Sequence, residues 1–367
     1  MRSFKMKKIF IAATKQNDGK TTVSLGLITN LKNRFQKVGF IKPIGQRYLE
    51  EEGLKIDEDS LLIEEVCGIK CGLKDMSPIA VEKGFTEKYI AQPRKQIISA
   101  QIKQAFGRVS KGQNLVVIEG TGHAGVGSVF DHSNAYVARL LGSKVIIISS
   151  GGIGRPIDEI LLNKALFEKE GVKVLGVIVN KVLPSKFDKI NQLVRKGLKR
   201  KGIDVLGVIP YNSILSLPTI EQILEETDFE LLCGKEALES YISNVIVGAM
   251  EPRDAIKYIL DDSLLITPGD REDMIKTALE CYRRDDEKRL KVSGIVLSGG
   301  ITPEKSTMDL LAKAKIPVLL AQDDTYLVTS TIHDLTVKIR PCDILKINTA
   351  IQLIKDNVDL DAISKGM

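Results

Sequence analysis

Residues 13–22 read ATKQNDGKTT and directly follow the apolar run KIFIA at 8–12. That run is short, β-branched and uninterrupted, which predicts a buried strand. Behind it, TTVSLGLITNLKNRF at 21–35 repeats apolar residues at helical spacing. A strand that turns through a glycine into a helix directs several backbone N–H groups at one spot, so the stretch predicts an anion-binding turn.

The residue types inside this turn fit phosphate chemistry. Gly19 permits close backbone approach, Lys20 is placed as the phosphate lysine, and Thr21 supplies a hydroxyl for Mg²⁺. Thr14 stands where the common pattern has glycine, and an accidental Gly-Lys-Thr at a helix start is the alternative. The residues that we expect to bind the nucleotide are Thr14, Lys15, Gln16, Asn17, Asp18, Gly19, Lys20, Thr21 and Thr22.

The alternation of strand and helix continues along the chain. Strand-like runs recur at 38–43, 114–120, 144–150, 174–180 and 204–210. Amphipathic helical stretches such as RPIDEILLNKALFEKEG separate them. Continuous apolar strands between helices predict a parallel sheet with both faces covered. We therefore expect an α/β fold of the P-loop NTPase type with a mostly parallel sheet.

The rhythm breaks at the polar stretch EQILEETDFE and then restarts. The second series of strand-like runs lies at 244–250, 264–269, 294–300 and 317–321. With 367 residues, two domains of roughly 150 residues fit the length. We expect a nucleotide-binding domain at 1–217, a second, smaller α/β domain at 218–340 and a C-terminal helix and tail at 341–367. The helix carries an apolar stripe, so we expect it to dock on the fold; the stripe is Ile344, Ile347, Ile351 and Ile354.

Polar residues lie where the predicted strands end, the edge at which open α/β sheets bind ligands. Glu119 follows a buried run and could hold Mg²⁺ directly or through water; a helix cap or surface acid is the alternative. Lys42 would face the same crevice unless it points to solvent. Asn180 and Lys181 form a pair typical of guanine readers, but Leu183 replaces the aspartate that guanine requires. Because asparagine also pairs with adenine, we favour ATP over GTP.

Six motifs in order, ATKQNDGKT, FIKP, DEDSLL, VIEGTG, VIVNKV and LGVIPY, resemble the dethiobiotin synthetase-like group of P-loop proteins over about residues 6–215. That group also carries threonine at the position of Thr14. The resemblance implies that Lys20 and Thr21 bind phosphates and Mg²⁺, and that Asp59 and Glu119 complete the metal site. Lys42 would then face the transferred phosphate or the substrate.

The same resemblance implies that Asn180 reads adenine, and we place Pro210 of LGVIPY with the cofactor-binding residues. Without it, Asp57 and Asp59 would be interpreted as a helix cap. EGTGHAGVGS departs from the EGAGG usual in true dethiobiotin synthetases, which leaves the substrate open. Lys15 occupies the position of the signature lysine of related dimeric ATPases, which reaches the partner's nucleotide. A phosphate contact within the chain and solvent exposure are equally open interpretations of Lys15.

The second half is similar to the DRTGG domain of long-form phosphotransacetylases. The motifs are VIVGAMEPRDAIKYI, LLITPGDREDMI, GIVLSGGITP and PVLLAQDDTYLVTS. Asp270 can cap the next helix, and Arg271 can face an anionic ligand at the strand ends; a cap plus a surface arginine is the alternative. In long phosphotransacetylases an acyl-transfer domain follows, and we expect it to be absent here.

Composition excludes several other classes. The net charge of +6 with 27% charged residues is too mild to argue for nucleic acid. Five scattered cysteines fit no zinc pattern, which favours reduced thiols in the cytoplasm. The apolar core of MRSFKMKKIFIAAT is too short for a signal peptide, and no stretch approaches a membrane span. We expect neither nucleic acid nor membrane as a partner.

Two functional hypotheses follow. The first is a homodimeric Mg·ATP-binding regulatory protein, whose second domain senses a small ligand or a partner such as a separate phosphotransacetylase or related acyl-transfer enzyme. The alternative is an ATP-dependent ligase, of dethiobiotin synthetase or cobyrinate diamide synthase type, in which Lys20 and Lys42 act catalytically on a phosphoryl group. A positioning ATPase on membranes is disfavoured because no membrane-seeking helix appears.

Overall fold

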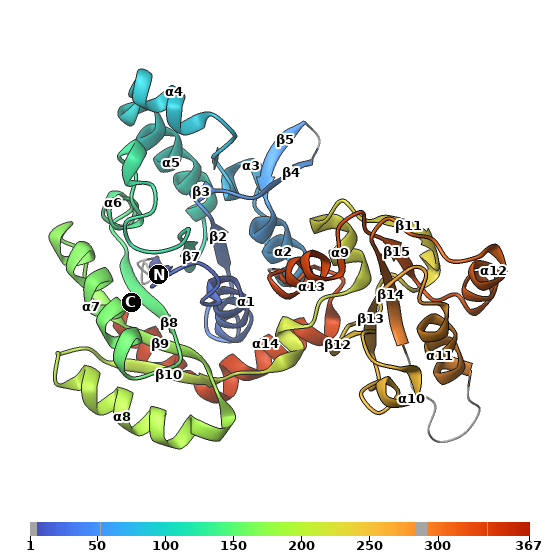
Figure 1. The fold of residues 1–367 in the computed structure, drawn as a ribbon. Helices are drawn as coiled ribbons and strands as arrows, with labels where there is room; N and C mark the ends of the chain where they lie inside the picture. The colour runs from blue at the N-terminus through green and yellow to red at the C-terminus, as the bar shows by residue number, and fades with distance from the viewer. Residues whose placement is uncertain (1–5, 52, 284–291, 336) are drawn as a thin grey trace. The chain divides into compact units, whose positions relative to one another are not determined.

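The computed structural model describes residues 6–51, 53–283, 292–335 and 337–367. The start of the stretch that resembles a signal peptide lies outside the described residues. The chain forms two compact units, one of Met1–Leu215 with Ile339–Met367 and one of Ser216–Lys338 (Figure 1). The first unit is therefore formed by the segments that precede and follow the second unit in the sequence.

The first unit is built on a six-stranded sheet in the order β10-β9-β8-β1-β7-β2, with every neighbouring pair parallel. Its strands are β1 (Lys7–Ala13), β2 (Val38–Ile41), β7 (Leu115–Glu119), β8 (Lys144–Ser150), β9 (Val174–Val182) and β10 (Val205–Pro210). This confirms the predicted α/β class with a mostly parallel sheet.

Two small strand pairs lie beside this sheet: β3 (Ile44–Gly45) with β6 (Ile79–Ala80), and β4 (Tyr48–Glu51) with β5 (Leu54–Asp57). The helices of the unit are α1 (Lys20–Leu31), α2 (Glu58–Cys67), α3 (Leu73–Met76), α4 (Phe85–Ala91), α5 (Lys95–Ser110), α6 (Asn134–Leu140), α7 (Gly154–Lys169), α8 (Phe187–Lys199), α14 (Ile344–Asn357) and α15 (Leu360–Gly366).

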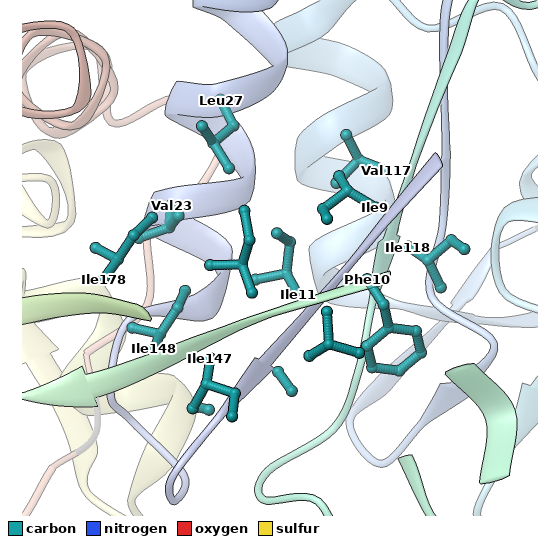
Figure 2. Close-up of a cluster of buried hydrophobic side chains, with 14 of the residues drawn as sticks. Ile9, Phe10, Ile11, Val23, Leu27, Val117, Ile118, Ile147, Ile148 and Ile178 are labelled. Atoms are coloured by element: carbon teal, nitrogen blue, oxygen red, sulfur yellow. The ribbon is translucent and has the colours of Figure 1, made fainter. Parts of the chain in front are cut away.

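The central strand β1 is buried on both faces. Ile9, Phe10 and Ile11 are each 0% exposed although their side chains alternate across the sheet. Figure 2 shows Ile11 beside Val23 and Leu27 of α1, with Phe10 on the other side of the strand. Helical cover on both faces explains the uninterrupted apolar run, and it places the end of β1 rigidly at the start of α1.

The C-terminal segment completes the first unit. Helix α14 packs on α1 (Figure 1), and residue Val358 beyond it forms an antiparallel bridge with Gly207 of β10. Ile347, Ala350 and Ile354 are its buried apolar residues, whereas Ile344 of the predicted stripe is 63% exposed. Ala350, rather than Ile344, therefore belongs to the buried face.

Gly26 marks the closest approach of α1 and α14. A Cβ atom there would lie 2.3 Å from Ile354 Cγ1 and 3.2 Å from the Ala350 carbonyl oxygen. Gly26→Ala is expected to lower the free energy of unfolding by about 1–3 kcal/mol, because the two helices must separate. Gly107→Ala on α5, where nothing lies within 4 Å, should instead stabilise the protein slightly. Urea denaturation measures both, and equal effects would contradict the packing argument.

The second unit has a five-stranded sheet in the order β11-β15-β14-β13-β12, with only the pair β11 and β15 antiparallel. Its elements are α9 (Ile220–Glu226), β11 (Glu230–Cys233), β12 (Asn244–Val247), α10 (Pro252–Ala255), β13 (Ser263–Pro268), α11 (Glu272–Arg283), β14 (Val292–Ser298), α12 (Lys305–Ala314), β15 (Val318–Leu320) and α13 (Thr325–His333). Leu265 and Leu264 alternate between two separate apolar clusters. The sheet is therefore also covered on both faces.

Candidate functional site

The turn between β1 and α1 is stabilised by hydrogen bonds to one of its own side chains. Asp18 Oδ2 accepts hydrogen bonds from Thr14 Oγ1 at 2.7 Å and from the Lys15 backbone N–H at 3.0 Å. Asn17 (φ 63°) and Gly19 (φ 93°) take the left-handed conformation, which lets the chain reverse into the helix. The predicted strand, turn and helix are therefore all present.

Glycine is required at position 19 both by the close contact with Asn180 and by the left-handed backbone conformation. A Cβ atom at Gly19 would lie 2.3 Å from Asn180 Nδ2. Asn180 at the end of β9 donates from Nδ2 to the Asp18 carbonyl oxygen at 2.9 Å, and its Oδ1 accepts from the Lys181 N–H at 2.9 Å. Asn180, predicted to read adenine, thus supports the turn through Nδ2, while its Oδ1 is held by the backbone of β9.

Lys181 adds a second contact from β9. Its Nζ donates to the Asn17 carbonyl oxygen at 2.7 Å, and burial lowers the pKa of its amine. The sequence analysis did not assign this role to Lys181, although the Asn-Lys pair is a local signal for it. Together Asn180 and Lys181 hold the outer half of the turn against the sheet.

A cluster of charges lies at the ends of β2, β5 and β7. Lys42 Nζ is 2.9 Å from Asp57 Oδ1, contacts Asp59 Oδ2 and is 3.9 Å from Glu119 Oε1. Thr21 Oγ1 donates to the same Glu119 oxygen at 3.1 Å. The structure therefore brings the predicted residues Thr21, Lys42, Asp59 and Glu119 together, and joins them through Lys42 rather than through carboxylates alone.

Burial controls the electrostatics of this cluster. It raises the pKa of Glu119 to about 7, reinforced by the negative charge of Asp59. Burial alone would lower the pKa of Lys42, but Asp59, Asp57 and Glu119 together outweigh it and hold that pKa above its usual value. Burial lowers the pKa of Lys20, against the attraction of Glu119. Among the described residues, none lies within ion-pair distance of the Lys20 amine.

Two observations decide whether Mg²⁺ fits here. Glu119 Oε2 is buried and has no hydrogen-bond partner among the described residues, and the Thr21 hydroxyl lies on the adjoining oxygen. The described residues contain no group of three or more His, Cys, Asp or Glu side chains suited to a metal. Mg²⁺ commonly keeps several waters and uses one or two carboxylates plus substrate phosphates, so Thr21 and Glu119 fit it.

Asp57 and Asp59 have distinct places. Asp57 caps α2, because its Oδ1 accepts from the Asp59 N–H at 3.0 Å. Asp59, predicted as a metal ligand, pairs with Lys42, as Asp57 also does. Asp57 is therefore the helix cap, and both aspartates also belong to the charged cluster around Lys42.

The remaining predicted residues of the first unit lie around the turn. Lys15 has a 44% exposed side chain, and its amine is 4.0 Å from Glu159 Oε2 on α7. Gln16 is exposed and donates to Gln46 Oε1 at 3.3 Å. Thr22 lies in the first turn of α1, and Pro210 ends β10, paired with Val182 of β9.

Buried asparagines that the sequence analysis missed shape the loop after β7. Asn163 of α7 accepts from the Ala124 N–H at 2.7 Å, and its Nδ2 lies 3.5 Å from the Thr14 carbonyl oxygen. Asn134 accepts from the Thr121 N–H at 3.1 Å and donates to two carbonyls of the same loop. An asparagine inside an amphipathic helix gives no local signal of such a role.

His132 anchors the end of that loop. Its Nδ1 is 2.7 Å from the Phe130 carbonyl oxygen and its Nε2 is 3.0 Å from Ser99 Oγ, which suits a neutral ring. Burial lowers its pKa below 6.5.

The contribution of His132 to stability is therefore expected to fall as the pH drops below 6.5, because the unfolded chain takes up a proton that the folded chain disfavours. Glu119, whose pKa is raised, contributes in the opposite direction, and this contribution is shared by the wild type and a His132 variant. Urea denaturation between about pH 7.5 and 5.5 measures this slope, which should be smaller in His132→Asn. Equal slopes in the two proteins would contradict it.

Of the two predicted ligand residues of the second unit, Arg271 is engaged by other groups of the same unit. Arg271 pairs with Asp273 at 2.9 Å and donates to the carbonyl oxygens of Gly248 at 3.1 Å and Met250 at 3.0 Å. Its guanidinium thereby ties the loop after β12 to the start of α11. Asp270 is exposed beside it.

Comparison with known families decides the classification. A family model described as an AAA domain, AAA_26, matches residues 7–219, more than half of the chain. The chain belongs to this family. A model of the DRTGG domain matches residues 222–335. Both halves recognised from sequence motifs are thus confirmed.

Known relatives match each part of this AAA-family chain. Phosphate acetyltransferase of Nitratidesulfovibrio vulgaris is 26% identical over 361 residues, covering 96% of this chain and 50% of that protein. ATP-dependent dethiobiotin synthetase BioD of Methanococcus vannielii is 26% identical over 203 residues, covering 55% of this chain and 92% of that protein. A putative plasmid partition protein of Borrelia burgdorferi bound to AMPPNP is 18% identical with a TM-score of 0.39, covering 57% of this chain and 89% of that chain.

The chain spans about half the length of the phosphate acetyltransferases it matches. The match relates this AAA and DRTGG pair to their N-terminal region. In the part of the chain that the structure describes, no helix combines the length and apolar character needed to cross a bilayer.

Proposed function

We propose that the first unit binds Mg·ATP at the turn between β1 and α1. One observation carries this proposal. The turn lies at the carboxyl ends of parallel strands together with Thr21, Glu119 and Lys20, and among the described residues the Lys20 amine has no ion-pair partner. Lys20 and the N-terminal amides of α1 would hold phosphate oxygens. Thr21 and Glu119 would hold Mg²⁺, which supplies charge neutralisation when bound.

We further propose that nucleotide binding has a regulatory role, as part of a homodimer. The support is the relationship to the N-terminal region of phosphate acetyltransferases, one of which aligns with 96% of this chain and therefore with both of its domains. The second unit would respond to a small ligand or to an acyl-transfer enzyme. Because Arg271 is engaged by Asp273 and by backbone carbonyls, an anion would have to compete for it.

Isothermal titration of the purified chain with ATP in the presence of Mg²⁺ tests the binding proposal. We expect saturable binding with one nucleotide per chain. Absence of heat and of thermal stabilisation at millimolar ATP would remove the proposal. Adding a phosphate acetyltransferase, with and without ATP, then tests the regulatory part through a change in its rate.

A ligase is the second candidate, favoured by the match to almost the full length of a dethiobiotin synthetase. In this function Lys20 and Lys42 would stabilise charge during phosphoryl transfer, while Glu119 and Thr21 hold the metal. ADP formation with a diamine and bicarbonate, lost in Lys42→Ala while ATP still binds, would support it. A panel of carboxylate and amine substrates that yields no ADP would count against it.

A further inference from the structure

Asp18 is the only acidic residue in the turn TKQNDGKTT. It is 2% exposed, and one of its carboxylate oxygens accepts hydrogen bonds from both the Thr14 hydroxyl and the Lys15 N–H. Its backbone carbonyl is held by Asn180. Asp18 is therefore fixed inside the turn that would receive phosphates, where a negative charge works against an anionic ligand.

Three lysines attract this carboxylate electrostatically. Lys15 and Lys20 belong to the same turn, and Lys181 reaches over it to the Asn17 carbonyl oxygen at 2.7 Å. Electrostatic attraction links Asp18 to each of these amines. Burial raises the pKa of Asp18, while the hydrogen bonds from Thr14 and Lys15 oppose that rise.

We propose that Asp18 is an internal counter-ion of the phosphate-binding turn and makes the site select metal-complexed ATP over free ATP. This inference rests on the proposed nucleotide function. A phosphate chain must share the lysines with Asp18, and the repulsion from Asp18 grows with the charge of the ligand. Free ATP carries two more negative charges than Mg·ATP, so Asp18 disfavours the free form more strongly.

The test compares Asp18→Asn with the wild type in titrations with ATP, once with Mg²⁺ and once with EDTA. Asparagine keeps an acceptor for Thr14 and Lys15 but removes the charge. The dissociation constant for Mg·ATP is expected to fall roughly 3-fold and that for free ATP roughly 10-fold or more, as expected for charges several ångströms apart at an intermediate dielectric. The ratio of the two constants should therefore shrink.

Asp188→Asn is the matched control, because it makes the same charge change at an exposed position on α8. Its ratio should equal that of the wild type. Asp18→Ala, which also removes the acceptor, should show the smaller ratio with weaker binding overall and lower thermal stability.

Two outcomes would overturn the inference. An unchanged ratio in Asp18→Asn, with a wild type that binds, means that Asp18 only shapes the turn. High salt should shrink the wild-type ratio toward that of Asp18→Asn, because salt screens the same repulsion. A wild type that binds neither form of ATP overturns the proposed nucleotide function and this inference with it.

Discussion

Lys42→Met is expected to lower the free energy of unfolding by about 3–5 kcal/mol. The lysine amine is the cation shared by Asp57, Asp59 and Glu119, whose side chains are 1%, 9% and 0% exposed. Removing it leaves the carboxyl groups of all three residues close together in a buried place without a cation, where water cannot compensate their charge. Methionine keeps the length and most of the volume of the side chain, so little of the loss would come from a cavity. Urea denaturation followed by circular dichroism measures the change.

Lys55→Met is the control, because Lys55 pairs with Glu82 at a similar distance of 2.9 Å but near the surface. It should leave stability essentially unchanged, since exposed pairs contribute little. Adding Asp59→Asn to Lys42→Met should recover part of the loss by removing one of the buried charges. A Lys42→Met protein as stable as the control would show that the cluster is not held together by this cation.

Lys20→Ala is expected to weaken Mg·ATP binding roughly 10- to 100-fold, as expected for a lost hydrogen bond to a charged group. Among the described residues the Lys20 amine has no ion-pair partner, and burial lowers its pKa. The lysine therefore contributes little to the fold and is available to phosphate oxygens. Titration calorimetry measures the affinity, and thermal denaturation should show a nearly unchanged protein.

Lys164→Ala provides the comparison, because Lys164 forms a surface pair with Glu168 one helical turn away on α7. Its affinity for Mg·ATP should match that of the wild type. Adenosine, which has no phosphates, should bind Lys20→Ala and wild type equally. A Lys20→Ala protein with full affinity for Mg·ATP would contradict the assignment of this turn as the phosphate site.

Much of the candidate site could be predicted because its signals are local. Gly19, Lys20 and Thr21 are consecutive, and the apolar run before them and the helix after them define where their backbone lies. Glu119 and Lys42 could be placed at the same edge because parallel strands share a carboxyl end. The rule predicts which strand ends converge, but not which side chain pairs with which.

The pairings had to come from the folded chain. Asp59 lies against Lys42, Asn180 holds the Asp18 carbonyl and Arg271 binds backbone oxygens. Each of these side chains has several partners compatible with the same position along a strand or loop. Side-chain rotamers and packing determine which partner is used, and neither can be read from the spacing of residues in the sequence.

The sequence by itself determined the main parallel strands and the phosphate-type turn, because these depend on periodicity and on a few consecutive residues. It did not indicate the short strands β3 to β6 or the antiparallel edge strand β11. Tertiary structure alone decided that α14 returns to pack on α1, that Gly26 is the point of contact, and that Lys42 sits among three buried carboxylates. The physical reason is distance along the chain. Gly26 and Ile354 are in contact although the whole second unit lies between them in the sequence. Close packing and charge pairing act through space rather than along the sequence.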